Sequence, residues 1–284
     1  FPTRRSSDLP KLVDTGAARI PYRVYGSGEP VLFIHGWPFW GFGYRKILPR
    51  LAEKYACYVI DLPGAGFSEW DENNDFSFHG HAENVKRLLD KLGLPSYHIV
   101  AHDTGATVAR RLAIIDPERA KQLALINTEI PHHRPPLVPL FQKLMALPGA
   151  NLTFRMLLKS RRFRRSAMGF GGCFVDMSLI EGDFHQHFVV PLYQSPQRME
   201  GQILYARGID WAQLDALAEG HRQIKGSVLL LWGERDPFFP IAEARPMVSQ
   251  FAHCRGLIPI ADCRLLPHEE RPDVVAQHIL EFFA

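Results

Sequence analysis

One stretch of the chain decides its fold: Tyr97-His98-Ile99-Val100-Ala101-His102-Asp103-Thr104-Gly105-Ala106-Thr107-Val108-Ala109. The apolar run at 98–101 predicts a buried strand, and the helical pattern that follows it is stopped by Pro117. Asp103 lies at the junction, and its close neighbours are small: Ala101, Gly105 and Ala106. A strand, a sharp turn and a helix that can approach each other closely are the parts that hold an exposed nucleophile at the tip of a turn.

Short apolar runs alternate with helical patterns along much of the chain. Buried strands are predicted at 31–34, 57–60, 122–126 and 227–231, with another near 256–261. Helices are predicted at 44–54, 81–92 and 273–283, and a hairpin at 11–15 and 19–25. This alternation predicts an α/β fold with a doubly wound, mostly parallel sheet.

The alternation is interrupted once, in the middle of the chain. From Pro131 the sequence reads as helical, with no strand run, and this segment is too long to be a loop. We therefore predict a core formed by residues 10–130 and 223–284, with a helical lid inserted at 131–222. Residues 1–9, FPTRRSSDL, resemble a translated sequencing adapter and are excluded from the fold prediction.

Composition excludes several classes of function. The net charge of +3 is too small to indicate a nucleic-acid partner. No apolar run reaches the roughly 20 residues that span a bilayer, so no membrane partner is expected. The four cysteines show no metal-ligand spacing, and no metal or cofactor is expected. With no signal peptide visible, we expect a cytoplasmic protein.

Four motifs in order carry a resemblance to a known family: His35-Gly36-Trp37-Pro38, Asp61-Leu62-Pro63-Gly64-Ala65-Gly66-Phe67-Ser68, Ala101-His102-Asp103-Thr104-Gly105 and Trp232-Gly233-Glu234-Arg235-Asp236-Pro237. From Gly26 onward the chain resembles the α/β-hydrolases that use an aspartate nucleophile, namely epoxide hydrolases and haloalkane or haloacid dehalogenases. The resemblance implies the nucleophile–acid–histidine order of that fold.

Asp103 suits displacement at a saturated carbon. A carboxylate with an ordinary pKa near 3.9 is already ionised at neutral pH and needs no base before it attacks. The product is an ester of Asp103, and its hydrolysis by water then needs a general base. The resemblance implies that the backbone N–H groups of Trp37 and Thr104 form the oxyanion hole. The alternative for Asp103 is a helix N-cap.

Two residues compete for the acid that orients the base. Asp236 follows a late strand, and its surrounding Trp-Gly-x-x-Asp-Pro pattern matches the family. Glu129 follows the preceding strand, where some dehalogenases and epoxide hydrolases carry their acid. We favour Asp236, whose alternative is a turn residue before Pro237.

The histidine is where the chain departs from its relatives. The stretch from Ala261 to Pro272 reads ADCRLLPHEERP, so Arg264 stands where Gly-His is expected, and the segment is one residue short. His268 is the only histidine in that loop and is assigned as the base. Two alternatives remain: the base is lost, or the gap is a sequence error.

The leaving group separates the subfamilies. Haloalkane dehalogenases resemble one another in a tryptophan directly after the nucleophile, and here that residue is Thr104. Epoxide hydrolases protonate the alkoxide from the lid, where this chain offers Tyr205. Three residues are expected to line the substrate pocket: His35, Trp40 and Tyr193.

These patterns predict a hydrolase that needs no cofactor and acts through an aspartyl ester. Opening of small hydrophobic epoxides to diols is favoured over haloalkane or haloacid dehalogenation. A catalytically impaired binding protein on the same fold is the alternative from another class. The individual substrate and the oligomeric state are left open.

Overall fold

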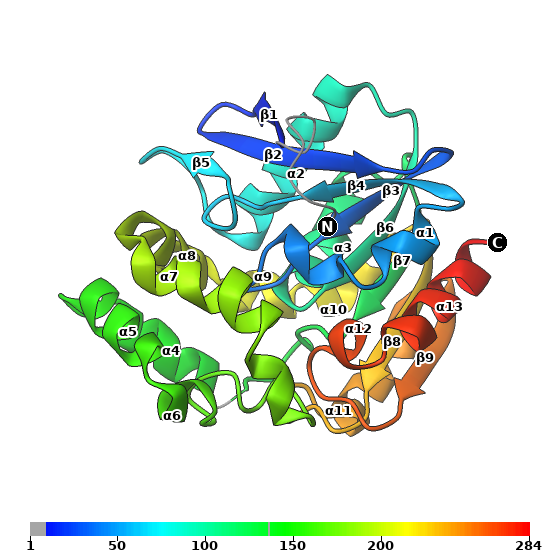
Figure 1. The fold of residues 1–284 in the computed structure, drawn as a ribbon. Helices are drawn as coiled ribbons and strands as arrows, with labels where there is room; N and C mark the ends of the chain where they lie inside the picture. The colour runs from blue at the N-terminus through cyan, green and yellow to red at the C-terminus, as the bar shows by residue number, and fades with distance from the viewer. Residues whose placement is uncertain (1–9, 136) are drawn as a thin grey trace.

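The computed structural model describes residues 10–135 and 137–284, so residues 1–9 lie outside it, and its centre is a nine-stranded sheet (Figure 1). The spatial order is β1 (Lys11–Asp14), β2 (Ala18–Tyr25), β4 (Tyr55–Ile60), β3 (Glu29–Ile34), β6 (Tyr97–His102), β7 (Ala120–Ile126), β8 (Ser227–Gly233) and β9 (Cys254–Ile260). β5 (Glu69–Trp70) pairs with β2. All pairs from β4 to β9 are parallel, which confirms the predicted mostly parallel sheet.

Both faces of the sheet are buried because alternate residues of each inner strand point to opposite sides. In β3, Leu32 and Ile34 join the core beneath α2 (Phe78–Leu92) and α3 (Thr104–Ile115). Val31 and Phe33 join the second core, which includes residues of α1 (Leu48–Leu51) and α13 (Pro272–Phe283). The parallel strands end at one edge of the sheet, and the residues that follow them there form the candidate site.

The segment between β7 and β8 is helical, and its helices gather beside the sheet rather than across it (Figure 1). They are α4 (Leu137–Met145), α5 (Ala150–Lys159), α6 (Arg161–Arg164), α7 (Val190–Gln194), α8 (Pro196–Gly208), α9 (Trp211–Asp215) and α10 (Leu217–Gly220), with short turns η3 (Met177–Ile180), η4 (His185–Val189) and η5 (His221–Gln223). An inserted helical lid is therefore present; its limits at 131 and 222 stay a prediction.

One predicted element differs clearly from the structure. The helix expected at 44–54 is replaced by two short turns, η2 (Gly41–Tyr44) and α1. Pro49 stands in the first turn of α1, and the residue before a proline is disfavoured in helical conformation. This prevents one continuous helix. The remaining short elements were not predicted: α11 (Ile241–Ala244), η6 (Arg245–Gln250) and α12 (Pro267–Glu270).

Candidate active site

Asp103 lies on a strained turn between β6 and α3. Its backbone has φ 52° and ψ −136°, a conformation that L residues seldom adopt, and it is the N-cap of α3. Glycines make the turn possible: a Cβ at Gly105 would lie 2.1 Å from the carbonyl oxygen of His35. A Cβ at Gly36 would lie 2.3 Å from the Asp103 Cβ. The small residues around Asp103 thus let strand, helix and the loop after β3 meet.

Two backbone N–H groups converge on one oxygen of Asp103. The N–H of Thr104 donates to Oδ1 at 2.6 Å, and the N–H of Trp37 donates to the same atom at 3.1 Å. The Trp37 N–H also lies 2.8 Å from the Thr104 hydroxyl oxygen. Oδ1 is therefore fixed by backbone donors, which leaves Oδ2 as the oxygen that can attack a substrate.

A cavity of about 120 Å³ lies between the core and the lid, and Asp103 and Thr104 form part of its wall. A cavity of about 150 Å³ accepts a benzene molecule, so this one suits a ligand of similar or smaller size. Most of its lining is aromatic or aliphatic and includes Phe141, Phe154, Phe170 and Phe238. The other polar side chains in the lining are Glu129, Gln202 and Cys173.

Glu129 brings a second carboxyl group to this cavity. Its Oε2 accepts a hydrogen bond from the Thr107 hydroxyl at 2.6 Å. Arg110 is fully buried beneath it and donates to the Glu129 carbonyl oxygen at 2.9 Å. Burial raises the pKa of Glu129. Burial, and then the charge of Glu129, raise the pKa of Asp103 well above its ordinary range. The pair therefore favours holding one proton between two carboxyl groups.

Asp236, the expected acid, lies buried beyond β8 with three donors around its carboxyl group. Asn127 donates to Oδ2 at 2.6 Å, and the N–H groups of Phe238 and Phe239 donate to Oδ1 at 2.8 and 3.2 Å. No histidine contacts it in the described part of the chain. Burial raises the pKa of Asp236 to about 7, because these neutral donors provide no compensating positive charge.

The structure does not bring His268 to the cavity, contrary to its assignment as base. Its ring packs 4.6 Å from the ring of His102 and 5.5 Å from that of Tyr44, measured between centroids. Burial, followed by the charges nearby, lowers the pKa of His268 well below its usual value. Helix α12 begins directly after Leu266, and its first turn buries His268 behind the cavity wall. This geometry argues against the base role.

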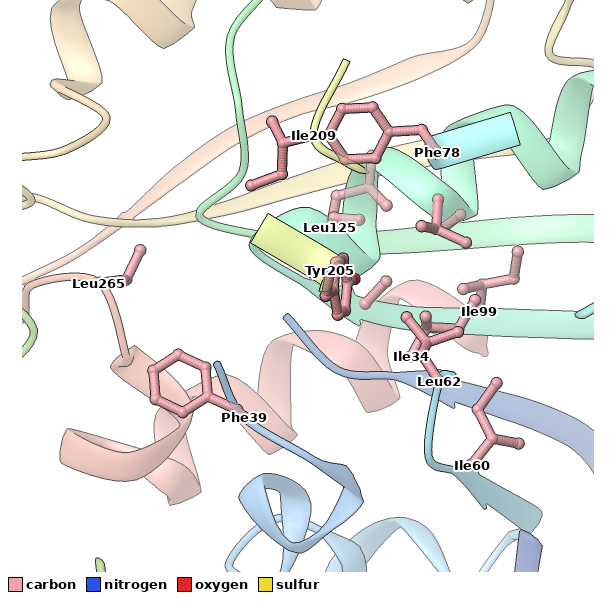
Figure 2. Packing of buried hydrophobic residues seen from close by; sticks show 14 of the residues in the cluster. Ile34, Phe39, Ile60, Leu62, Phe78, Ile99, Leu125, Tyr205, Ile209 and Leu265 are labelled. Atoms are coloured by element: carbon pink, nitrogen blue, oxygen red, sulfur yellow. The ribbon is translucent and has the colours of Figure 1, made fainter. Parts of the chain in front are cut away.

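Leu265 is the residue of this loop that reaches the cavity. Figure 2 shows it on the loop before α12, and Phe39 on the loop after β3; both line the cavity. The carbonyl oxygen of Leu265 accepts a hydrogen bond from His102 Nε2 at 2.9 Å, which holds the loop before α12 in place. Among the described residues, no histidine lines the cavity. An apolar side chain thus stands where the loop would be expected to present the base.

Arg264 and Glu270 tie this loop to the lid. The Arg264 guanidinium donates to the Gly171 carbonyl oxygen at 2.8 Å. Glu270 accepts the N–H of Arg264 at 2.8 Å with one oxygen and that of Val175 at 2.7 Å with the other. Arg264 therefore serves the contact between core and lid.

The remaining predicted site residues also lie outside the cavity lining. Tyr205 is buried in the core (Figure 2), and its hydroxyl lies 3.0 Å from that of Thr104. His35 donates from Nδ1 to the Gly36 carbonyl and accepts at Nε2 from the N–H of Leu62. The indole N–H of Trp40 donates to the His187 carbonyl oxygen, and Tyr193 is half-buried on α7. The pocket assignment of His35, Trp40 and Tyr193 is replaced by the lining described above.

Sequence reasoning missed most of the cavity wall, including the aromatic side chains named above and three further residues: Cys173, Gln202 and Leu265. Cys173 and Gln202 come from the lid, where no motif marks them. The carbonyl oxygen of Gln202 accepts the indole N–H of Trp37 at 2.9 Å. Because this contact joins residues far apart in the sequence, no local pattern predicts the position of Gln202. Leu265 could have been noticed, since it follows Arg264 directly at the departure from the family pattern.

A family model for the α/β hydrolase fold matches residues 29–272, so the chain belongs to the α/β-hydrolase fold family. This family and the curated relatives that the chain resembles identify it as a hydrolase. It is 26% identical to haloalkane dehalogenase 2 of Mycobacterium bovis over 287 aligned residues, which cover 95% of this chain and 93% of the relative.

Two solved structures share the fold over nearly the whole chain. An epoxide hydrolase, CorEH without ligand, matches with a TM-score of 0.82 and 20% identity, covering 96% of this chain and 98% of the other. An ancestral haloalkane dehalogenase, AncHLD2, matches with a TM-score of 0.77 and 21% identity, covering 95% and 97%. At these identities the likeness concerns the fold.

Proposed function

We propose that the protein opens small apolar epoxides to diols through a covalent ester on Asp103. The observation that carries this proposal is the setting of Asp103. Its Oδ1 accepts two backbone N–H groups, while the carboxyl group faces a small apolar cavity. Such a carboxylate can displace a leaving group from a saturated carbon without activation by a base.

In the first step, Oδ2 of Asp103 forms a bond to an epoxide carbon, and the carbon–oxygen bond of the ring breaks. The released alkoxide takes a proton from the Glu129 carboxylic acid. Burial and Glu129 raise the pKa of Asp103, but the N–H groups of Thr104 and Trp37 that face it can only donate and act in the opposite direction. We therefore place the one proton of the pair on Glu129. The Thr107 hydroxyl beside Glu129 can rotate and accept instead, so it tolerates the protonated form.

In the second step, water attacks the ester carbon and gives a proton to the Glu129 carboxylate. The negative charge that develops on Oδ1 meets the N–H groups of Trp37 and Thr104, which already point at this atom. The departing diol oxygen then takes the proton from the Asp103 carboxylic acid. Glu129 ends protonated and Asp103 ends ionised, which are the states in which they began. The proton transfers of both steps are therefore complete without a histidine.

Two contacts favour an epoxide over a haloalkane. Trp37 supplies the only indole in the described cavity lining, and its N–H is already donated to the Gln202 carbonyl oxygen, so it offers no donor to halide. The buried side-chain oxygen Oε1 of Gln202 has no partner in the described chain. A hydroxyl on the ester intermediate could donate to it, and only an epoxide generates that hydroxyl.

The deciding experiment is the intact mass of the protein after exposure to 1,2-epoxybutane or 1-bromobutane, with peptide mapping of Asp103. The whole epoxide adds to the mass, whereas the butyl group arrives without bromide. Diol formation, with an adduct on Asp103 during turnover, supports the proposal. Halide release without diol formation favours dehalogenation. If neither compound leaves an adduct or product, the catalytically impaired binding protein gains support.

A further inference from the structure

The outer surface of the lid carries an apolar patch that is separate from the cavity. Its members are large apolar side chains of α4, α5 and the turn between them, each 38–63% exposed: Leu140, Leu147, Leu152, Met156 and Leu157. We call this set the outer lid patch. In Figure 1, α4 and α5 lie at the outer margin of the lid, away from the sheet.

Helix α5 shows why the patch is unusual. Its inner face buries Ala150, Phe154 and Leu158, which recur at a spacing of four residues. Its outer face repeats an apolar pattern at the same spacing, with Leu152 60% exposed and Met156 63% exposed. A surface helix normally turns polar residues outward, whereas a helix that is apolar on both faces is usually covered on both.

The segment that carries the patch is basic, and the exposed Glu200 of α8, which accepts a hydrogen bond from Asn151 of α5 at 2.9 Å, is an acidic group at its edge. Between Glu129 and Asp176 the sequence has no Asp or Glu and eight Lys or Arg residues. Some are neutralised from elsewhere, since Arg134 pairs with Asp215, and Glu181 pairs with Arg161 and Arg164. Three exposed cations without an ion pair in the described chain lie on α4, at the end of α5 and on α6: Lys143, Lys159 and Arg162.

We propose that the outer lid patch docks on the surface of an anionic lipid bilayer. Leucine and methionine side chains enter the apolar boundary of the bilayer, and the flanking cations meet anionic headgroups, as in helices that lie in a membrane interface. A second copy of this chain fits less well, because a symmetric contact would bring two basic surfaces together. A nucleic acid or acidic protein would leave the apolar side chains without a partner.

This proposal revises the expectation of no membrane partner, which rested only on spanning segments. In the described residues, no helix is long and apolar enough to cross a membrane. Docking concerns the opposite face of the helices that wall the cavity, because α4 contributes Phe141 and Met145, and α5 contributes Phe154 and Leu158, to its lining. It goes beyond the proposed reaction and does not depend on it.

The test is cosedimentation of the full chain with vesicles of phosphatidylcholine, alone or mixed with phosphatidylglycerol. The wild type is expected to bind the anionic vesicles at least fivefold better than the neutral ones. The double variant Leu152→Ser with Met156→Ser is expected to lose at least fivefold of this binding. Lys159→Gln with Arg162→Gln is expected to lose binding to anionic vesicles and to show less dependence on salt.

Matched controls replace exposed apolar residues elsewhere, Leu12→Ser with Val274→Ser, which are 39% and 43% exposed. These variants should bind vesicles like the wild type, and thermal unfolding should show that all variants are folded. Equal binding by the outer lid patch variants and the wild type would overturn the proposal. So would wild-type dimers that form without lipid and dissociate in the Leu152 and Met156 variant, which would assign the patch to a second copy.

Discussion

The two sides of the Asp103 carboxyl group differ in how completely they are built. On one side, the N–H groups of Trp37 and Thr104 already hold Oδ1 at 3.1 and 2.6 Å. On the other side, the loop after β9 presents Leu265 to the cavity, and His268 packs behind it against Tyr44 and His102.

The difference teaches which parts of a site depend on packing and which depend on a single side chain. The N–H donors belong to the backbone, and their positions follow from the close approach that Gly36 and Gly105 allow. Few changes short of misfolding would remove them. A general base, in contrast, is a single side chain on a loop. If the loop is one residue shorter, a different residue faces the cavity, and an aliphatic side chain can take the place of an imidazole. In the proposed reaction, Glu129 takes the role of the base from the loop that follows β7.

The largest effect on activity is expected from removing the nucleophile, whose Oδ1 is already held by both backbone N–H donors. Asp103→Asn keeps the shape of the side chain but removes its negative charge, so attack on carbon should fall by at least about a thousandfold. Intact mass after exposure to 1,2-epoxybutane measures this directly. Labelling of the variant at the wild-type rate would place the nucleophile elsewhere.

Glu129→Gln sharpens the comparison, because it tests whether the incomplete side is served by this carboxyl group. We expect ester hydrolysis to slow by about 10² to 10⁴, the usual range for general acid–base catalysis. Displacement of bromide from 1-bromobutane needs no proton donor, so Asp103 should be labelled at the slow rate expected for the wild type, and the ester should persist. A purely structural role would depress labelling as well. Mass measured over time after removal of the bromoalkane separates these outcomes.

Leu265→His attempts to complete the deficient side. Because residue 265 lines the cavity, an imidazole there should speed hydrolysis of the ester by about tenfold or more, within the range of a positioned base. Leu265→Phe is the matched control, since it offers a ring without nitrogen. Equal ester lifetimes in the two variants would mean that residue 265 cannot serve the reacting water, and the contrast between the two sides would need another cause.

The smallest expected effect is on the pH dependence of the free energy of unfolding, through the buried carboxyl group of Asp236. Its pKa is about 7 in the folded protein, against 3.8 for the ordinary side chain. Between these values the folded state holds a proton that the unfolded state has lost, so stability should decrease as pH rises from about 4 to about 7. The decrease is at most about 4 kcal/mol, from 1.36 kcal/mol per pKa unit.

Denaturant unfolding of the wild type and Asp236→Asn across this pH range would measure that contribution. The variant cannot ionise, so its stability should depend less on pH, whatever its absolute value. A histidine near Asp236 would pair with the ionised carboxylate and remove the effect. Parallel pH profiles for the two proteins would therefore contradict the isolated setting described for Asp236.

Much of the fold could be predicted because its signals are local. The turn at Asp103, the apolar runs of the parallel strands and the shift to helical pattern after Pro131 each reflect constraints within a few residues. The helix expected at 44–54 failed for a local reason as well, since Pro49 permits a helix to begin but not to pass through it.

The site was harder to predict because motifs give positions along the chain but not the directions of side chains. Tyr205 matches the pattern of a lid tyrosine only in part, since Ala206 separates it from Arg207, and its hydroxyl bonds to Thr104 rather than lining the cavity. His35 stands in a family motif, yet both its ring nitrogens are used by backbone groups. Leu265 and Gln202 enter the site only through tertiary packing.

Trp37 holds two parts of the molecule at once. Its backbone N–H contacts the Asp103 carboxylate, and its indole N–H is bonded to the Gln202 carbonyl on α8 of the lid. Lifting α8 to admit a substrate would break the indole bond or displace the loop that carries the backbone donor. Entry of substrate and stabilisation of the reacting carboxyl group therefore both depend on Trp37. Negative charge on Oδ1 is best stabilised while α8 stays in contact with the Trp37 indole.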